Sequence, residues 1–425
     1  MRFALMLAFA AVVPCGQVDA YPLDGYASTG IGRLEEARRV QEGLLPGVKQ
    51  PKGALLPTEA VDLRLLEHPD FQIPAPDPEF SMALVALLGD RAGDYNLAVL
   101  DLSDLAHPVY AEHRADEARN PGSVGKLLVG LGLFQTLADV YPDDIQARLD
   151  VLRNTVITAD DFIISDHHTV RMWDRDGEKL IRRPLEVGDR GTLYEYLDWM
   201  MSASSNAAAA TVMKQMMLLG HFGRDYPVSD AAGKSLFKDT PRTDLNALLA
   251  TVIQTPVTRN GLDLTQFRQG SFFTATGKRY VPGTSSYGTA RELMRYLVRL
   301  EQGKLVDAFS SREIKRLLYV TERRIRYAST PTLMPAAVYF KSGSLYECRP
   351  EPDFRCLKYH GNVKNYMNSV AIIEAPAAER RLYYLVALMS NVLRRNSAVD
   401  HQTLASRIHK LIEQRHAEAP RAPVQ

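Results

Sequence analysis

The sequence carries almost no net charge. Its 51 basic and 50 acidic residues leave a formal charge of +1 over 425 residues. This balance creates no overall field that would attract nucleic acid or an anionic membrane surface. Zinc-enzyme patterns such as H-E-x-x-H are missing as well. We therefore expect no nucleic-acid partner, no metal and no cofactor.

Long apolar runs are missing after residue 20, so we expect no membrane span. Residues 1–20 themselves combine Arg2, an apolar stretch from 3 to 13 and small residues that end at Ala20. This pattern is typical of a secretory signal peptide that is cleaved near Ala20. A buried N-terminal helix is the alternative. We predict that the protein is exported to the periplasm.

Cysteine is scarce, with three residues in the chain. Cys15 would leave with the signal peptide. Cys348 and Cys356 remain, close together in a polar, proline-containing loop. A pair of this kind in an oxidising compartment favours a disulfide, which would staple the end of a hairpin. Two free thiols are the alternative; a metal site would need more ligands, and His360 is the one histidine near them.

Strand patterns occur near both ends of the sequence, and helical patterns lie between them. The strands are expected at 96–102, 108–113, 337–343, 369–374 and 381–388, with the helical region at 123–301. One sheet assembled from distant segments, with a helical lobe inserted, explains this order. We divide the chain into the signal peptide (1–20), an N-terminal extension (21–79), a main domain (80–416) and a disordered tail (417–425).

The first motif with chemical meaning is Ser123-Val-Gly-Lys126, which follows the turn residues Asn120-Pro-Gly122 and opens an apolar helical run. A serine in the first turn of a helix lies beside free backbone N–H groups that can stabilise an oxyanion. Lys126 lies three residues later on the same face and can reach the hydroxyl. Burial would lower the lysine pKa, so the pair predicts a nucleophile and its base. A helix-capping serine beside a solvated lysine is the alternative.

A second S-x-x-K sequence, Ser235 to Lys238, lies in a polar stretch and lacks this context. Two further motifs follow Ser123 in order. Ser204-Ser-Asn206 separates two helical segments, and Lys341-Ser-Gly343 falls inside a strand pattern. Each alone fits a structural role, as a helix cap or an exposed strand lysine. The three together, in this order, point to an active-site serine hydrolase.

With these motifs the chain resembles a class A β-lactamase or a related penicillin-binding D,D-peptidase, over roughly residues 80–416. The resemblance implies an α/β (α+β) fold with an antiparallel sheet flanked by helices and an inserted all-helical lobe. It also implies roles for the motif residues: Ser204 relays a proton to the leaving nitrogen, and Asn206 holds the substrate amide. Lys341, Ser342 and Gly343 bind a substrate carboxylate, and the N–H groups of Ser344 and Ser123 form the oxyanion hole.

The chain departs from the class A pattern in two places. Ser205 stands where those enzymes carry Asp. The segment that would supply a water-activating Glu reads Arg242-Thr-Asp-Leu-Asn246, with Arg242 at the Glu position. Asp239 or Asp244 are the possible substitutes; loop carboxylates without a catalytic role are the alternative. Without such a base, acylation proceeds while hydrolysis is slow.

Two other polar clusters have simpler interpretations. Asp166-His167-His168 suggests a metal, but adjacent histidines diverge on most backbones, so we expect a solvated loop. The segment 322–326 is expected to form an exposed basic face.

The sequence thus supports three hypotheses. The first is an exported serine hydrolase that acts on a β-lactam amide through a covalent acyl-enzyme. The second is a D,D-peptidase on D-alanyl peptides of peptidoglycan. The third is a penicillin-binding or sensor protein without turnover. The partner in each is a small molecule or peptide; oligomeric state is not predicted.

Overall fold

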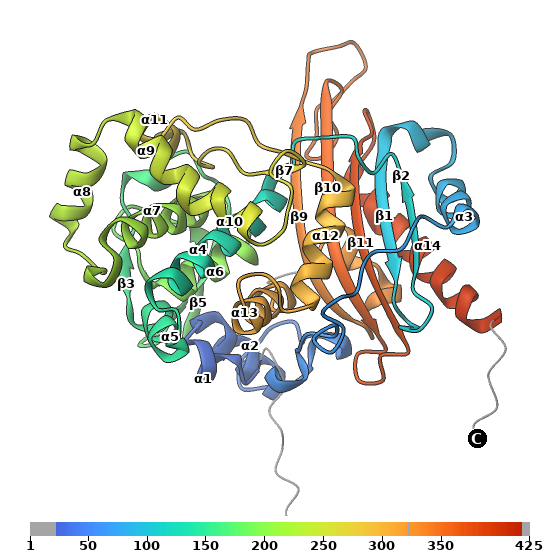
Figure 1. Cartoon of the computed structure of the whole chain (residues 1–425), viewed down its shortest axis with the longest axis horizontal. Coiled ribbons are helices and arrows are strands. Elements are labelled where there is room, and N and C mark those ends of the chain that lie inside the picture. The colour runs from blue at the N-terminus through green and yellow to red at the C-terminus, as the bar shows by residue number, and fades with distance from the viewer. Residues whose placement is uncertain (1–22, 322–323, 419–425) are drawn as a thin grey trace, which may run out of the picture.

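A computed structural model describes residues 23–321 and 324–418 of the chain (Figure 1). The predicted signal peptide, its cleavage position at Ala20 and residues 419–425 lie outside the described residues. The centre is a five-stranded antiparallel sheet in the order β2-β1-β11-β10-β9. Its strands are β1 (Tyr95–Asp101), β2 (Val109–His113), β9 (Ala337–Glu347), β10 (Lys364–Ala375) and β11 (Leu382–Asn391). The prediction of one sheet built from both ends of the chain is confirmed.

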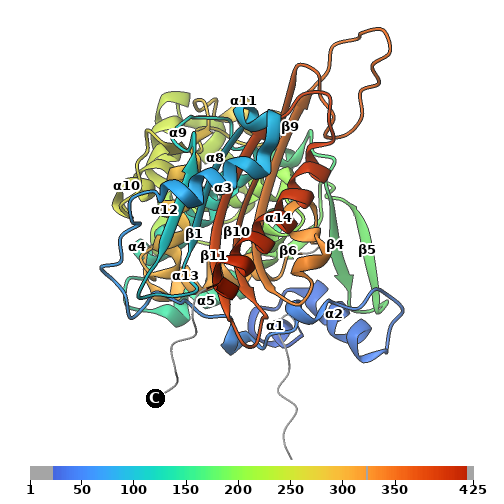
Figure 2. The same cartoon turned by 90° about the vertical axis from the view of Figure 1, so that its right-hand side faces the viewer.

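Helices cover both faces of this sheet. Along β1, Leu97 and Val99 pack in one apolar cluster with helices α3 (Pro78–Leu88) and α14 (Ser397–Glu418). The intervening Ala98 and Leu100 belong to the other, larger cluster, because successive side chains of a strand point to opposite faces. Figure 2 shows α3 and α14 across the outer face. Helices α12 (Ala290–Glu301) and α13 (Ala308–Tyr319) cover the inner face.

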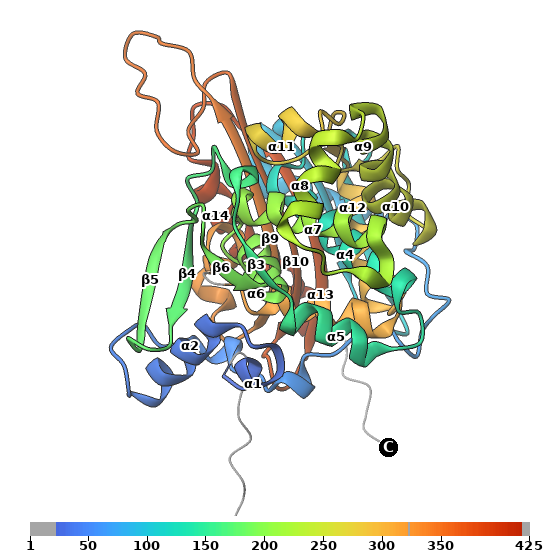
Figure 3. The same cartoon turned by 90° about the vertical axis from the view of Figure 1, so that its left-hand side faces the viewer.

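A mainly helical lobe packs beside the inner face (Figure 3). Its central helix α4 (Lys126–Val140) is apolar almost throughout and buried along most of its length. With the preceding turn it is the single segment, among the described residues, long and apolar enough to cross a membrane, and 78% of it is buried inside the protein. Around it lie α5 (Ile145–Asn154), α6 (Leu193–Met201), α7 (Asn206–Phe222), α8 (Asp230–Asp239), α9 (Arg242–Leu249), α10 (Thr255–Arg259) and α11 (Ala275–Tyr280).

The lobe also contains short strand pairs that the sequence did not predict. The longest is the hairpin of β4 (Thr169–Asp174) and β5 (Lys179–Pro184). Its side chains are mostly half-buried, so its sequence lacks the alternation of apolar and polar residues that marks a strand. The other pairs join β3 (Val156–Thr158) to β6 (Arg190–Thr192), and β7 (Phe267–Arg268) to β8 (Tyr287–Gly288).

The N-terminal segment runs along the base of both parts of the molecule (Figures 1 and 3). It forms helices α1 (Gly25–Thr29) and α2 (Gly32–Glu42) and then short turns of helix. Arg33 of α2 makes a buried ion pair of 2.6 Å with Asp198 of α6, in the lobe. Further along, Arg64 pairs with Glu374 of β10, in the sheet, at 3.0 Å. This segment therefore ties the lobe to the sheet.

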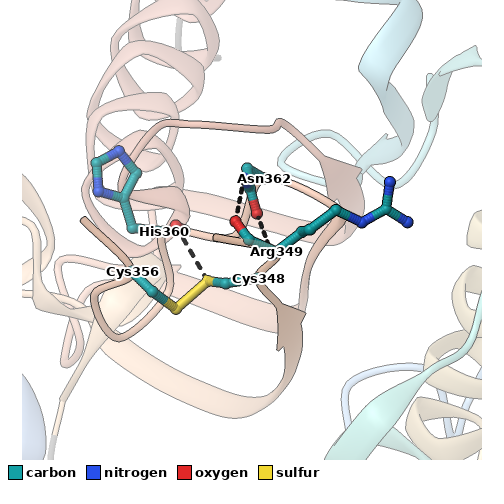
Figure 4. Close-up of a disulfide and its surroundings, with 5 residues drawn as sticks. All are labelled: Cys348, Arg349, Cys356, His360 and Asn362. Carbon is teal, nitrogen blue, oxygen red and sulfur yellow. Dashed lines mark hydrogen bonds between the residues drawn. A yellow bond between two sulfur atoms is a disulfide. The ribbon is translucent and has the colours of Figure 1, made fainter. Parts of the chain in front are cut away.

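Strands β9 and β10 are joined by a projecting loop, which we call the flap (residues 348–363; Figure 1). The predicted disulfide between Cys348 and Cys356 is confirmed, with a Cα–Cα distance of 6.0 Å. Figure 4 shows it beside a second brace. The Asn362 amide accepts from the backbone N–H of Arg349 at 2.8 Å and donates to its carbonyl at 2.9 Å. The disulfide and these two hydrogen bonds therefore cross-link the base of the flap.

Candidate active site

A cleft of about 570 Å³ opens between the lobe and the edge strand β9. All three sequence motifs contribute to it. Ser123 comes from the turn before α4, Ser204 and Asn206 from the start of α7, and residues 341–344 from β9. These segments are far apart in the sequence, and the fold places them around one cavity.

Ser123 and Lys126 are in direct contact. Ser123 lies in the turn η4 (Gly122–Gly125), and Lys126 begins α4 directly after it. The lysine Nζ donates to Ser123 Oγ at 2.9 Å, to the Ser204 carbonyl at 2.8 Å and to Asn206 Oδ1 at 2.7 Å. Three acceptors therefore hold the amine in place beside the hydroxyl.

The surroundings of Lys126 favour its neutral form. The side chain is completely buried, and its amine lies 4.6 Å from the centre of the Phe273 ring. Burial lowers the pKa of Lys126 to about 7, with the charge of Arg326 acting in the same direction and Asp166 opposing it. Much of this amine is thus uncharged near neutral pH and available to accept a proton.

Ser204 is held between two lysines. Its carbonyl accepts from Lys126, and its Oγ accepts from Lys341 Nζ at 2.8 Å. Burial, and then the charges of Lys126 and Arg326, lower the pKa of Lys341 well below its ordinary value. Ser204 also has φ +62°, a left-handed conformation that costs a non-glycine residue about 1–2 kcal/mol. Strain of this kind is typical of residues whose position serves a function.

Gly343 brings β9 against the turn that carries Ser123. A Cβ at position 343 would lie 2.5 Å from the Ser123 nitrogen and 2.6 Å from the Pro121 carbonyl oxygen. Gly122 lies on the other side of the same contact. Its φ is +53°, and a Cβ at this position would lie 3.3 Å from the Ser344 nitrogen. Only glycine allows backbones to approach this closely. The contact brings the Ser344 end of β9 next to the Ser123 turn.

Asp166 is a site residue whose role the sequence did not reveal. Its side chain is 3% exposed, so the expectation of a solvated loop is wrong for this residue. Asp166 Oδ2 accepts from Ser205 Oγ at 2.8 Å and from the Ala207 N–H at 2.9 Å. Although burial opposes it, hydrogen bonds from His168, Ala207 and Ser205 hold the pKa of Asp166 below its ordinary value. A carboxylate from a distant loop thus fixes the turn between Ser204 and Asn206.

His168 shares the carboxylate of Asp166 and is about half-exposed, at 45%. Its Nδ1 lies 2.6 Å from Asp166 Oδ1, and both histidines of this segment line the cleft. Across residues 23–321 and 324–418, no group of three His, Cys, Asp or Glu side chains is arranged to hold a metal ion.

Arg326 is the second site residue that the sequence did not identify. It was expected on an exposed basic face, but its guanidinium points into the cleft. It donates to Ser342 Oγ at 2.8 Å, to Ser344 Oγ at 3.0 Å and to the Tyr359 hydroxyl at 2.9 Å. Its φ of +53° is again left-handed. Arg326 therefore adds a fixed positive charge beside Lys341 and Ser342, where an anionic group could bind.

The carboxylates considered as water-activating bases lie elsewhere. Asp239 is exposed on α8 and accepts from Ser235, the serine of the second S-x-x-K sequence. Asp244 is exposed on α9, two residues after Arg242. Neither belongs to the described residues that line the cleft, where Asp166 is the one acidic side chain. Asp166 is already engaged by five hydrogen-bond partners, so it is poorly placed to act as a base toward water.

Comparisons with known proteins agree with this architecture. No protein-family profile matches the chain, and no curated protein matches it in sequence. Among solved structures, a class A β-lactamase from Bacteroides cellulosilyticus aligns with 13% identity and a TM-score of 0.50, covering 81% of this chain and 100% of its own. A β-lactamase from Chitinophaga pinensis aligns with 11% identity and a TM-score of 0.50. It covers 79% of this chain and 98% of its own.

The TLA-3 extended-spectrum β-lactamase gives the same values, with 11% identity, a TM-score of 0.50 and coverage of 79% and 98%. At identities this low, the likeness lies in the arrangement of the backbone. That arrangement includes an antiparallel sheet flanked by helices, with a lobe beside it. The chain has the fold of the class A β-lactamases.

Proposed function

We propose that this protein is an exported serine hydrolase whose Ser123 is acylated by the amide of a β-lactam. The observation that carries the proposal is the 2.9 Å contact between Ser123 Oγ and the buried amine of Lys126. A serine hydroxyl is a weak nucleophile until a neighbouring base takes its proton. Lys126, with a pKa of about 7, is such a base.

The proposed acylation uses the residues in a fixed order. Neutral Lys126 accepts the Ser123 proton, and Oγ attacks the carbonyl carbon of the substrate. The N–H groups of Ser123 and Ser344 stabilise the oxyanion. Collapse of the intermediate breaks the C–N bond, and Ser204 gives its proton to the leaving nitrogen. Lys341, which donates to Ser204 Oγ at 2.8 Å, replaces that proton, so Ser204 stays neutral while the proton taken from Ser123 remains on Lys126.

Substrate binding involves the same strand. Asn206 would hold the substrate amide beside Ser123, and Lys341 with Ser342 would bind a carboxylate on the leaving side. Arg326 donates to Ser342 and so extends this positive end of the cleft. Bidentate pairing with a carboxylate is a common use of a guanidinium held in this way.

A second candidate follows from the step after acylation. Hydrolysis of the ester needs a base for water, and the one carboxylate among the described cleft residues is occupied by hydrogen bonds. This favours a long-lived acyl-enzyme with β-lactams. A D,D-peptidase that cleaves D-alanyl peptides, or a sensor without turnover, would behave in this way.

Incubation with a fluorescent penicillin tests the proposal. Wild-type protein should become covalently labelled, and Ser123→Ala should lose all label because the attacking oxygen is gone. Ser235→Ala is the matched control: it removes the serine of the other S-x-x-K sequence, which is exposed on α8, and should label like wild type. Label that decays while drug is consumed indicates a β-lactamase; label that persists indicates the second candidate.

Two results would contradict the proposal. One is wild-type protein that stays unlabelled under conditions that label a known penicillin-binding protein. The other is label that survives Ser123→Ala. Export is tested separately: the N-terminus of the protein isolated from the periplasm should begin directly after Ala20.

A further inference from the structure

The charge of the cleft differs from that of the whole chain. Over the sequence, basic and acidic residues balance to +1. The described residues that line the cleft include four basic side chains and one acidic side chain, Asp166. The basic ones are Arg182, Arg326, Lys341 and Lys358. Because Asp166 is 3% exposed and already paired, the field inside the cleft is positive.

The four basic side chains form two groups. Lys341 and Arg326 lie with Ser342, where the proposed function needs one carboxylate. Arg182 and Lys358 come from other elements, and we call these two residues the outer group. Arg182 projects from β5, and its Nε donates to Thr169 Oγ1 at 3.3 Å. Lys358 comes from the flap, with its amine 5.1 Å from the centre of the Tyr359 ring.

The outer group has no acidic partner in the part of the chain that the structure describes. No carboxylate there lies within ion-pair distance of Arg182 or Lys358, whereas the neighbouring Arg183 pairs with Asp189 at 2.7 Å. Both outer side chains are exposed and line the cavity from different elements. Like charges gathered without counter-charges cost energy, which an anionic ligand would relieve.

We infer that the cleft selects substrates that carry a second carboxylate, on the acyl side of the scissile amide. This inference rests on the proposed function. The leaving side of the substrate takes its carboxylate to Lys341, Ser342 and Arg326. The other variable part of such a substrate is its acyl side chain, whose negative charge pairs with Arg182 and Lys358 of the cleft lining. The substrate class is therefore a dianionic acyl amide.

Benzylpenicillin and α-carboxybenzylpenicillin form a matched pair of probes, because they differ by one carboxylate on the acyl side chain. Their binding to full-length Ser123→Ala is measured by calorimetry, so that no acylation intervenes. The carboxylated compound should bind up to about fivefold more tightly for each exposed ion pair it makes. This preference should shrink in about 1 M salt, because exposed charges are screened there.

Substitutions test whether the outer group causes the preference for the carboxylated penicillin. In the Ser123→Ala background, adding Arg182→Gln and Lys358→Gln together should abolish the preference while leaving the affinity for benzylpenicillin nearly unchanged. Arg381→Gln is the control, because Arg381 is 73% exposed and lies outside the cleft lining. Equal binding of the two penicillins, or a preference that survives the double substitution, overturns the inference. Binding of neither compound contradicts the inference and the proposed function together; labelling of wild type reports on the function alone.

Discussion

At the scale of single residues, two buried lysines surround Ser204. Lys126 donates to its carbonyl and Lys341 to its hydroxyl oxygen. Both side chains are almost fully buried, and the charge of Lys126 adds to burial in lowering the pKa of Lys341. Two ammonium groups in one desolvated site are costly, so the site favours one neutral amine. The amine beside Ser123 is the one that the chemistry needs in neutral form.

The pH dependence of acylation tests this assignment. Because the pKa of Lys126 is about 7, the neutral base increases as pH rises through 7 and is nearly complete above about 8. The acylation rate constant should therefore rise about tenfold from pH 6 to 8 and then level off. Stopped-flow measurement with a chromogenic β-lactam across pH 5.5–9 checks it.

A matched variant distinguishes loss of the base from loss of the folded structure. Lys126→Arg keeps a positive charge that cannot be lost near neutral pH, so it should abolish the rise and reduce acylation by about 10²-fold or more. Circular dichroism at each pH shows whether the fold is retained. A wild-type rate that does not change between pH 6 and 8 would rule out Lys126 as the base.

At the scale of elements, the site depends on how β9 meets the turn before α4. The edge strand of the sheet and the first turn of the central helix touch through backbone atoms at Gly343 and Gly122. No side chain adjusts this contact, so the distance between the two proposed oxyanion donors depends on two glycines. Displacing reacting groups by about 1 Å can reduce a rate by about 10²-fold.

Substituting Gly343→Ala tests this contact. The added methyl group would lie 2.5 Å from the Ser123 nitrogen and 2.9 Å from that of Val124, both backbone atoms. The strand must move away, and acylation of Ser123 should fall by about 10²-fold, as measured with a chromogenic β-lactam. Gly130→Ala in α4 is the control, since a Cβ there meets nothing within 4 Å. It should keep wild-type acylation; a Gly343→Ala protein with that same rate would contradict the role of the contact.

The parts of the site that the sequence predicted are those whose interacting residues lie close together in the chain. Ser123 and Lys126 lie one helical turn apart, so the sequence alone indicated their contact. Asp166 acts from a loop and Arg326 from a short helical turn, and their partners in the three motifs are 39 and 16 residues or more away. Their positions depend on tertiary packing and, for Arg326, on a left-handed backbone conformation. No local sequence pattern indicates either of these.

The same distinction applies to secondary structure. The strands of the main sheet are rich in buried apolar residues and were predicted within a few positions. The hairpin of β4 and β5 contains several charged residues and is half-exposed, and it was missed. It nonetheless supplies Arg182 to the cleft. Elements that form the core can be predicted from the sequence, whereas elements that shape the cleft are harder to predict from it.

At the scale of the whole molecule, one buried lysine joins four distant segments. Lys315 of α13 lies 2.6 Å from Glu301 of α12 and 3.0 Å from Glu374 of β10, and all three side chains are fully buried. Its amine also donates to the carbonyl of Asp62, in the N-terminal segment, at 2.7 Å. Arg64 of that segment completes the network through Glu374. The sequence did not assign a role to this segment; in the structure it closes the network beneath the sheet.

Replacing Lys315 with methionine should destabilise the whole molecule. The substitution leaves Glu301 and Glu374 buried beside each other, with Arg64 as the remaining counter-charge. Removing one partner of a buried ion pair typically costs about 3–5 kcal/mol of unfolding free energy. Urea denaturation followed by circular dichroism measures this loss, and proteolysis should cleave the N-terminal segment earlier than in wild type. Lys364→Met makes the same change at an exposed pair with Glu347 and should leave the unfolding free energy nearly unchanged. If both variants lose equally little stability, the network around Lys315 does not hold the N-terminal segment in place.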